Sequence, residues 1–514
     1  MSCEFKTNAD ELQGLDSKEN IKEDEARSGS KFKQYLAAII CSILPFAQGT
    51  VVGWPSTTLP LLQSEDNPIG STPMTEEDAS WIGSLICIGA ILSVPVFSYL
   101  VNNQSRKMAG YIAAMPLIPS WLLVIFANSK NMLHSARFIA GLSCGGGTVV
   151  IPLFVAEISE DSVRGALSTL TVLFFNGGIL FAYCAGSYFR FHSLACICLT
   201  LVILFIVCFY FVPESPVFLM SRNRQNEAAR SLRWLRGDDQ GAISTEIAKL
   251  RRISQENRER MEAMGLKEAL LSRATIKGLT IGLGLCLNQQ LSGLYAVLVY
   301  TVNIFQESGS SVSPYVATIL VGILQIFGSY IASLLVDRAG RRVLLVFSNL
   351  CMTTCLGCLG SYFYLKQSTD VSAYGWVPVV SLSTFIVAVS VGPGALFFLI
   401  VSEVFSERVR NIATTLCVCS LWLLMFLVGK FFSGAGRLQV EKPKPAAFIT
   451  GKIMNGREVS PGYQRHYTDS KLSTDFSRDN NGREEGVVKG NSIHIEVTTC
   501  ADMSHVSYFV IRGT

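Results

Sequence analysis

Residues 193–212 read SLACICLTLVILFIVCFYFV, an unbroken apolar run without a charged side chain. An α-helix rises about 1.5 Å per residue, so about 20 such residues cross the roughly 30 Å hydrocarbon core of a bilayer. The run does not alternate apolar and polar residues, which excludes a strand of a membrane β-barrel. It therefore predicts a membrane-spanning helix.

Ten further stretches share this length and apolar character. They are residues 34–53, 80–101, 108–128, 132–154, 168–188, 277–300, 312–336, 343–365, 376–400 and 412–432. A span in lipid must pair its backbone polar groups within the protein, and a helix does so within its own segment. The sequence thus predicts an all-α, polytopic membrane protein with about eleven spans.

The composition agrees with this fold class. Of the 514 residues, 49% are hydrophobic and 16% charged, and the mean hydropathy of +0.37 excludes an ordinary soluble protein. The net charge of +4 gives no reason to expect a nucleic-acid partner. The 15 Cys lie mainly in apolar runs and the 5 His are isolated. Because no HExxH, P-loop or nucleophile motif stands in a suitable context, we expect no metal, no cofactor and no enzymatic activity.

The distribution of Lys and Arg predicts the orientation. Residues 55–79 and 306–314, which follow the first and seventh spans, contain neither Lys nor Arg, whereas the loops on the opposite side are basic. Cytosolic loops carry the excess of Lys and Arg. We therefore expect a plasma-membrane protein with a cytosolic N-terminus and with residues 222–277 on the cytosolic face.

The chain divides into five parts by this reading. They are a cytosolic tail (1–33), an N-terminal six-helix bundle (34–216), a cytosolic helical linker (217–275), a C-terminal bundle with five of six helices (276–432) and a polar, disordered tail (433–514). The tail contains no apolar run long enough for a twelfth span.

The loops of the two bundles repeat a charge pattern. Glu precedes Arg by seven residues in Glu157–Arg164 and again in Glu403–Arg410, with an offset of 410 − 164 = 246. The basic loop 102–107 likewise corresponds to 337–342, with an offset of 337 − 102 = 235. Internal repeats of about six helices are typical of secondary transporters.

Several short motifs carry a resemblance to a known family. They are Gln289-Gln-Leu-Ser-Gly293, Pro213-Glu-Ser-Pro216, Asp337-Arg-Ala-Gly-Arg-Arg342, Arg164-Gly165 and Ser402-Glu403-x-Phe405. With these motifs the chain resembles the sugar-porter branch of the major facilitator superfamily. GTVVGW at 49–54 and ASWIGS at 79–84 resemble the insect facilitated trehalose transporters within that branch. The resemblance implies a major facilitator fold of two six-helix halves, here with the last helix absent, and transport of a sugar.

The chain also departs from the family pattern. Asn102 and Asn103 stand where the first basic loop usually has Asp and Arg, Tyr295 replaces an Asn, and Phe398 replaces a Trp. These changes alter the first basic loop and two positions that hold ligand residues in the family.

A sugar is uncharged and rich in hydroxyl groups, so its site needs donor and acceptor side chains in an apolar cavity, with aromatic faces beside them. Gln289 and Gln290 supply such groups within a span. The resemblance places Gln289, Gln290, Gln325 and Trp422 at ligand positions, and we add Asn176, Tyr295 and Phe398 as candidates. Alternatively, a Gln buried in a span only ties helices together.

Charged residues at the cytosolic helix ends suggest a gate. Salt bridges between the two halves would hold an outward-open state and break when the inside opens, and the altered Asn102–Asn103 loop predicts a weaker latch in the N-terminal half. Alternatively, these charges are only solvated. The candidates are Glu157, Arg164, Glu214, Asp337, Arg338, Arg341, Glu403 and Arg410.

No span contains Asp or Glu away from its ends. Proton-coupled carriers need a titrating carboxylate in the membrane, where such a group is costly and conspicuous. We therefore expect passive, facilitative transport of trehalose or a hexose, with no obligate protein partner. A proton-coupled symporter, a non-transporting sugar sensor and an inactive truncated isoform remain as alternatives.

Overall fold

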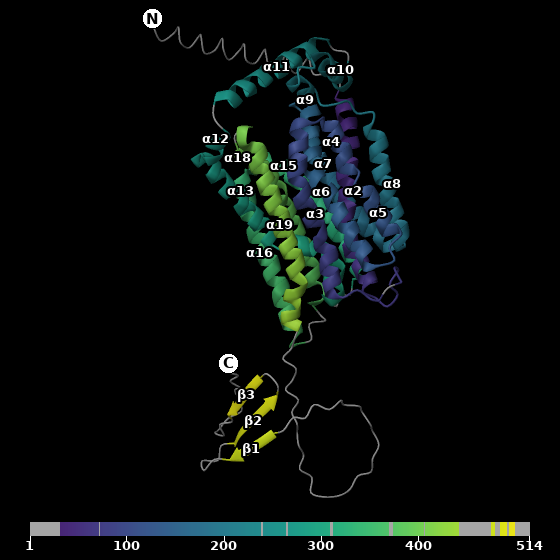
Figure 1. Cartoon of the computed structure of the whole chain (residues 1–514), viewed down its shortest axis with the longest axis vertical. Coiled ribbons are helices and arrows are strands. Elements are labelled where there is room, and N and C mark those ends of the chain that lie inside the picture. Colours follow the sequence, from purple (N-terminus) through teal and green to yellow (C-terminus); the bar gives the residue numbers. More distant parts are fainter. Residues whose placement is uncertain are drawn as a thin grey trace. The chain divides into compact units, whose positions relative to one another are not determined.

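The computed structural model describes residues 31–70, 72–237, 240–263, 266–308, 312–369, 374–405 and 407–440, and in the tail 474–478, 484–490 and 493–498 (Figure 1). Most of the predicted N-terminal tail 1–33 and much of the tail 433–514 therefore lie outside the described residues. The chain forms two compact units, Met1–Lys442 and Pro443–Thr514. The first unit contains the helices.

Six apolar spans make up the N-terminal half. They are α2 (Phe32–Leu62), α3 (Glu76–Asn103), the pair α4 (Arg106–Ala114) and α5 (Leu117–Ile125), α6 (Lys130–Ile158), α7 (Arg164–Tyr188) and α8 (Phe191–Phe209). A polar cap fixes the first turn of α3. The Thr75 side chain accepts a hydrogen bond from the Asp78 backbone N–H, and the Asp78 side chain accepts one from the Thr75 backbone N–H.

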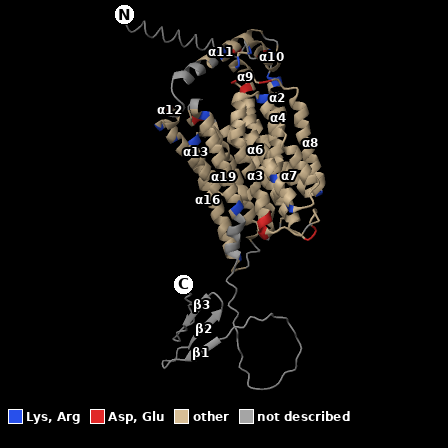
Figure 2. Cartoon of the chain, viewed as in Figure 1, with Lys and Arg blue, Asp and Glu red and all other residues tan. Residues whose placement is uncertain are grey.

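Four further helices follow at one end of the bundle: α9 (Pro216–Ser221), α10 (Gln225–Arg236), α11 (Gln240–Ala263) and α12 (Leu266–Leu271). We call this the linker end and the opposite end the loop end. Figure 2 shows that the charged residues lie mostly at these two ends, whereas the middle of the bundle contains few of them.

Five spans form the C-terminal half. Their helices are α13 (Arg273–Leu291), α14 (Leu294–Ser308), α15 (Pro314–Ala339), α16 (Arg341–Lys366), α17 (Val377–Val391), α18 (Pro393–Val404) and α19 (Glu407–Val440). Together the described residues contain 11 helical stretches long and apolar enough to cross a membrane. This number agrees with the prediction.

Three of these spans are broken, which the apolar runs did not reveal. Pro116, which lacks a backbone N–H, separates α4 from α5. Gly293, at φ +80°, separates α13 from α14, and Gly392 followed by Pro393 separates α17 from α18. A positive φ is readily adopted by Gly because it has no Cβ.

Glycines allow close helix packing inside the N-terminal half. A Cβ placed on Gly141 of α6 would lie 2.1 Å from the Ile86 carbonyl oxygen of α3, and one on Gly49 of α2 would lie 2.0 Å from that of Phe175 on α7. Such close contact of backbones is common in membrane helices, where small residues line the interface.

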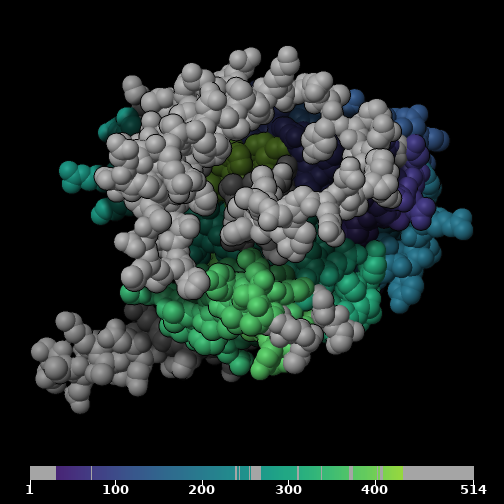
Figure 3. All heavy atoms as spheres, turned by 90° about the horizontal axis from the view of Figure 1, so that it is seen from below, coloured from purple at the N-terminus to yellow at the C-terminus, as the bar shows by residue number. Residues whose placement is uncertain are grey.

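The two halves meet along three seams, in which α3 packs on α19, α7 packs on α15 and α2 packs on α14. In Figure 3 the purple-to-blue atoms of the N-terminal half and the green atoms of the C-terminal half lie on different sides of the bundle. The repeat predicted from the loops therefore corresponds to two packed halves, with the seams between them.

The tail differs from the disordered segment that we expected. Helix α19 continues to Val440, and β1 (Thr474–Arg478), β2 (Glu484–Gly490) and β3 (Ile493–Thr498) form an antiparallel sheet in the order β1-β2-β3. The run Ile493-His-Ile-Glu-Val-Thr498 alternates apolar and polar residues, a pattern that predicts a strand. The overall polarity of the tail hid this signal.

Candidate functional site

Gln289 and Gln290 lie at the end of α13, next to the break at Gly293. Their side chains are 9% and 2% exposed, and neither carbonyl oxygen has a hydrogen-bond partner. An unpaired amide oxygen in the protein interior costs free energy comparable to a lost hydrogen bond. Two adjacent buried acceptors without partners therefore need a ligand or water to satisfy them.

Gln325 and Asn176 connect the two halves across the α7–α15 seam. Gln325 Nε2 donates to Asn176 Oδ1 at 3.1 Å, and Asn176 Nδ2 donates to the Ser329 hydroxyl at 2.7 Å. The Gln325 carbonyl oxygen is buried and unpaired. The structure therefore brings these two predicted residues together, but it engages the Asn176 amide in a contact between helices.

Trp422 of α19 is 7% exposed, and its indole N–H has no acceptor. The four side chains that the resemblance placed at ligand positions thus present three buried acceptors and one buried donor, all unpaired. They come from α13, α15 and α19. This set of groups matches the chemistry of an uncharged polyhydroxy ligand.

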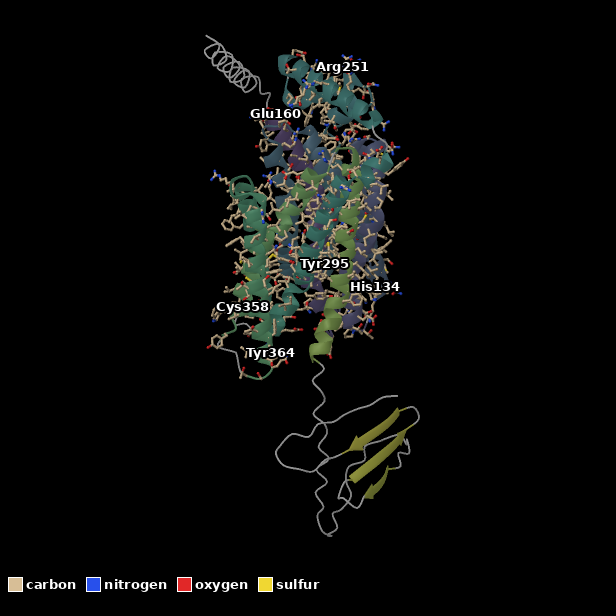
Figure 4. All side chains as sticks on the ribbon, turned by 90° about the vertical axis from the view of Figure 1, so that its left-hand side faces the viewer. His134, Glu160, Arg251, Tyr295, Cys358 and Tyr364 are labelled. Atoms are coloured by element: carbon tan, nitrogen blue, oxygen red, sulfur yellow. The ribbon has the colours of Figure 1, made fainter. Side chains whose placement is uncertain are left out.

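The two aromatic candidates behave differently. Tyr295 is 1% exposed and donates its hydroxyl to the Gly83 carbonyl oxygen of α3 at 2.5 Å; Figure 4 shows it inside the helix bundle. Phe398 is 44% exposed, and its ring contacts Phe397 edge-on at 4.9 Å. Neither offers an unpaired buried polar atom.

The predicted gate residues of the N-terminal half form a buried network at the linker end. Glu157 pairs with Arg106 at 3.2 Å, with side chains 10% and 12% exposed, and accepts from the Ser215 hydroxyl at 2.5 Å. Glu214 accepts from the Ser105 hydroxyl and from the Lys107 backbone N–H at 3.2 Å. Our prediction omitted Arg106 and Ser215, although the basic loop and the Pro-Glu-Ser-Pro motif contain them.

The C-terminal half holds the corresponding pair, Arg341 with Glu403 at 2.7 Å, but these side chains are 42% and 45% exposed. The offsets 341 − 106 = 235 and 403 − 157 = 246 equal those between the loop motifs. The repeated loops therefore build the same ion pair in both halves. Although the Asn102–Asn103 loop departs from the family pattern, the pair of the N-terminal half is the better shielded of the two, and the weaker latch stays a prediction.

The remaining gate candidates make no bridge between the halves in the described part of the chain. Arg164 pairs with Asp161 at 2.5 Å, and Arg338 and Arg410 are exposed and form no ion pair with a described side chain. The side chain of Asp337 lies outside the described residues. The described ion pairs of the gate candidates thus join residues of the same half, whereas Lys430 and Glu77 at the loop end pair across the halves at 3.9 Å. That the gate charges bridge the two halves during transport stays a prediction.

Sequence reasoning missed a buried arginine in α6. Arg137 is 3% exposed, and it donates to the Ile82 and Val51 carbonyl oxygens at 2.9 and 2.6 Å. Its guanidinium lies 5.7 Å from the Trp54 ring. No carboxylate pairs with it among the described residues. A single Arg within an apolar span is the signal that could have identified it.

The loop end carries a further contact between the halves. Lys430 of α19 donates to the Ser80 hydroxyl at 3.0 Å and lies 4.0 Å from the Trp81 ring centroid, both on α3. Asn303 of α14 donates to Gln63 at 3.2 Å. No group of three or more His, Cys, Asp or Glu side chains that could hold a metal occurs in the described residues.

Three kinds of comparison relate the chain to known proteins. The family model described as "Sugar (and other) transporter" matches residues 37–436. The facilitated trehalose transporter Tret1 of Culex quinquefasciatus is 34% identical over 409 residues, which cover 78% of this chain and 77% of that protein. The protein of the same name from Apis mellifera ligustica is 32% identical over 401 residues, with 78% and 79% of the two chains covered.

A solved structure shows the same fold. The major facilitator proton:xylose symporter XylE, bound to 6-bromo-6-deoxy-D-glucose, aligns with a TM-score of 0.65 and 21% identity, covering 79% of this chain and 89% of that chain. Together with the eleven apolar helices, this likeness establishes an all-α, multi-pass membrane protein with the major facilitator fold.

Proposed function

Because the chain belongs to the sugar transporter family, we propose that it carries trehalose or a hexose across the membrane by facilitated diffusion. The family membership makes it a membrane transporter and not an enzyme. The substrate is taken from the relatives, which are named facilitated trehalose transporters. The proposed binding residues are those that the resemblance placed at ligand positions, and their unpaired buried polar atoms support the choice.

One observation carries the site assignment. Gln289, Gln290, Gln325 and Trp422 each hold a buried polar atom without a partner. A neutral hydrogen bond contributes about 0.5–1.5 kcal/mol net, and millimolar affinity requires about −4 kcal/mol. Four such bonds are therefore enough for a weak, fast-releasing sugar site, which suits a carrier.

The charge distribution favours uniport over proton symport. No Asp or Glu stands in a span away from its ends. The buried cation of α6, Arg137, is bonded to backbone carbonyl oxygens, which do not titrate. A proton-coupled carrier needs a carboxylate that gains and loses its proton during the cycle. This chain offers none within the membrane.

Alternating access follows from the two-halves architecture. The sugar site lies on α13, α15 and α19, and the seams α3–α19 and α7–α15 allow one half to rock against the other. The basic linker end faces the cytosol in this proposal, with the N-terminus on the same side and the protein in the plasma membrane.

The test is uptake of labelled trehalose and glucose, divided by the abundance of the protein at the cell surface. Gln290→Ala should lower uptake per molecule about tenfold or more, because a carbonyl that binds sugar is lost. The matched control is Gln48→Ala, since Gln48 is also a buried Gln but donates to the Ser143 carbonyl oxygen at 2.8 Å. This variant should lower abundance more than uptake per molecule. Unchanged uptake by Gln290→Ala would contradict the site, and sugar binding without net flux would indicate a sensor.

A further inference from the structure

The broken seventh span connects the cores of the two halves. Cys286 of α13 packs in a C-terminal core cluster with Phe397 and Val401. Beyond the break, Tyr295 and Val299 of α14 belong to the large cluster of the N-terminal half. Gly293, at φ +80° and with open space around its Cα, lies between them. Helix α14 can therefore change its angle to α13 at this residue.

Tyr295 is the point at which α14 meets α3. Its hydroxyl donates to the Gly83 carbonyl oxygen at 2.5 Å, and the side chain is 1% exposed. A Cβ on Gly83 would lie 3.2 Å from Val299 Cγ1 of α14. The contact therefore depends on a small residue in α3 and on a hydroxyl in α14.

Helix α19 completes the same contact. A Cβ on Gly429 would lie 3.1 Å from Tyr295 Cε1 and 3.1 Å from the Ser84 hydroxyl of α3. The next residue, Lys430, contacts Ser80 and Trp81, also on α3. We call Gly83, Ser84, Tyr295 and Gly429 the Tyr295 junction. It joins α14 and α19 of one half to α3 of the other.

The hydrogen bond of Tyr295 distinguishes this residue from the other candidates for sugar binding. Gln289, Gln290 and Trp422 keep unpaired polar atoms, whereas the Tyr295 hydroxyl is used by a helix backbone. A hydroxyl bonded in an apolar interior must lose that bond when the helices separate. The bond thus stabilises the arrangement in which the loop end is packed shut.

We propose that Tyr295 is a positioning residue that locks the loop end of the carrier closed, and not a ligand of the sugar. This inference rests on the proposed function, because the contact at Tyr295 would control how often the sugar site opens toward the loop end. Removing the hydroxyl should shift the conformational equilibrium by about threefold to tenfold toward the open loop end, the effect of one buried hydrogen bond.

The experiment measures opening directly, without sugar. Ser84 is fully buried in the junction, so a cysteine there reacts with a water-soluble thiol reagent only when the junction opens. The full chain carrying Ser84→Cys is purified in lipid nanodiscs, and labelling is compared with the chain without that cysteine. Adding Tyr295→Phe should speed labelling of Cys at this position by about threefold to tenfold.

A matched control removes a tyrosine hydroxyl that is bonded within one half. Tyr362 is 5% exposed and donates to the Ser308 carbonyl oxygen of α14 at 2.8 Å, but both residues belong to the C-terminal half. Tyr362→Phe should leave the labelling rate unchanged. If Tyr295→Phe does not yield folded protein, Gly83→Ala serves instead, because its methyl pushes α14 away while the Tyr295 hydroxyl remains.

Equal labelling rates for Tyr295→Phe and Tyr362→Phe would overturn the lock. A loss of trehalose affinity in Tyr295→Phe with an unchanged labelling rate would make Tyr295 a sugar ligand and would overturn it as well. If trehalose and glucose fail to alter labelling of any variant, the proposed substrates are wrong, yet the comparison of the two Phe variants still decides the lock.

Discussion

The two halves build one ion pair in two environments. In the N-terminal half, Arg106 and Glu157 are 12% and 10% exposed, and the Phe218 ring of α9 lies 4.6 Å from the Arg106 guanidinium. In the C-terminal half, Arg341 and Glu403 are 42% and 45% exposed. Both halves therefore contain the ion pair, and α9, which follows the first half, shields the pair of that half from water.

This difference in exposure suggests different roles for the two corresponding ion pairs. A shielded pair interacts strongly and leaves a costly charge when one partner is removed, whereas an exposed pair is screened and contributes little. We infer that the pair of the N-terminal half is a fixed structural element and that the pair of the C-terminal half can open and close at low cost.

The largest expected effect comes from Glu157→Gln. The change leaves the Arg106 guanidinium in a site that is 12% exposed, without its carboxylate, and should destabilise the protein by about 3–5 kcal/mol. A thermal-unfolding midpoint measured on the purified protein checks this. A loss no larger than that of the matching change in the other half would remove the distinction between the two pairs.

The matching change, Glu403→Gln, should have a much smaller effect. The Arg341 guanidinium stays accessible to water, so the expected loss is about 0–1 kcal/mol. The same unfolding measurement applies, with added salt as a control that should reduce the difference from the parent protein. A large, salt-independent loss would show that the pair becomes buried in the protein as it exists in lipid.

The smallest effect concerns Asp161, which lies between α6 and α7. A hydrogen bond from Lys249 of α11, together with Arg164, lowers the pKa of its carboxyl group. Because the folded-state pKa is lowered, the stabilisation is fully present above the unfolded value of about 4 and is lost as the pH falls through the folded value.

Stability should therefore not depend on Asp161 between about pH 5 and 7. Asp161→Asn should differ from the parent protein by a constant amount in that window, and the two should converge at lower pH. The midpoint of thermal unfolding as a function of pH measures this. A difference that grows on acidification would mean that the pKa is raised instead.

Much of the fold was predictable because it depends on local composition. Apolar runs of about 20 residues have one solution in lipid, so the eleven helices follow from counting. The breaks at Gly293 and Gly392 did not follow, since a Gly within an apolar run is tolerated in many continuous spans. Whether it breaks a helix depends on the neighbours that hold the two pieces.

The candidate site was predictable only in part. The amides of Gln289 and Gln290 are conspicuous in an apolar span, and the structure leaves their carbonyl oxygens unpaired. The hydrogen-bond partner of Tyr295 was not predictable, because a tyrosine fits a sugar site and a contact between helices equally well. Only the packing of α14 on α3 distinguishes them.

The partners of the gate charges could not be predicted either. The sequence indicates which charges gather at helix ends, but Arg106 and Glu157 are 51 positions apart and meet only in the folded half. The shielding of that pair comes from α9, whose cap at Ser215 also bonds Glu157. Burial of this kind is a property of the assembled helices.

The most direct test of the proposed carrier is counterflow in proteoliposomes that contain the purified full chain. Vesicles loaded with unlabelled trehalose are diluted into a trace of labelled trehalose, with and without an imposed inward proton gradient. A facilitative carrier should show transient uphill accumulation of label that is the same in both conditions and is lost in Gln290→Ala. Accumulation that requires a proton gradient would contradict uniport, and binding of trehalose without any accumulation would contradict transport.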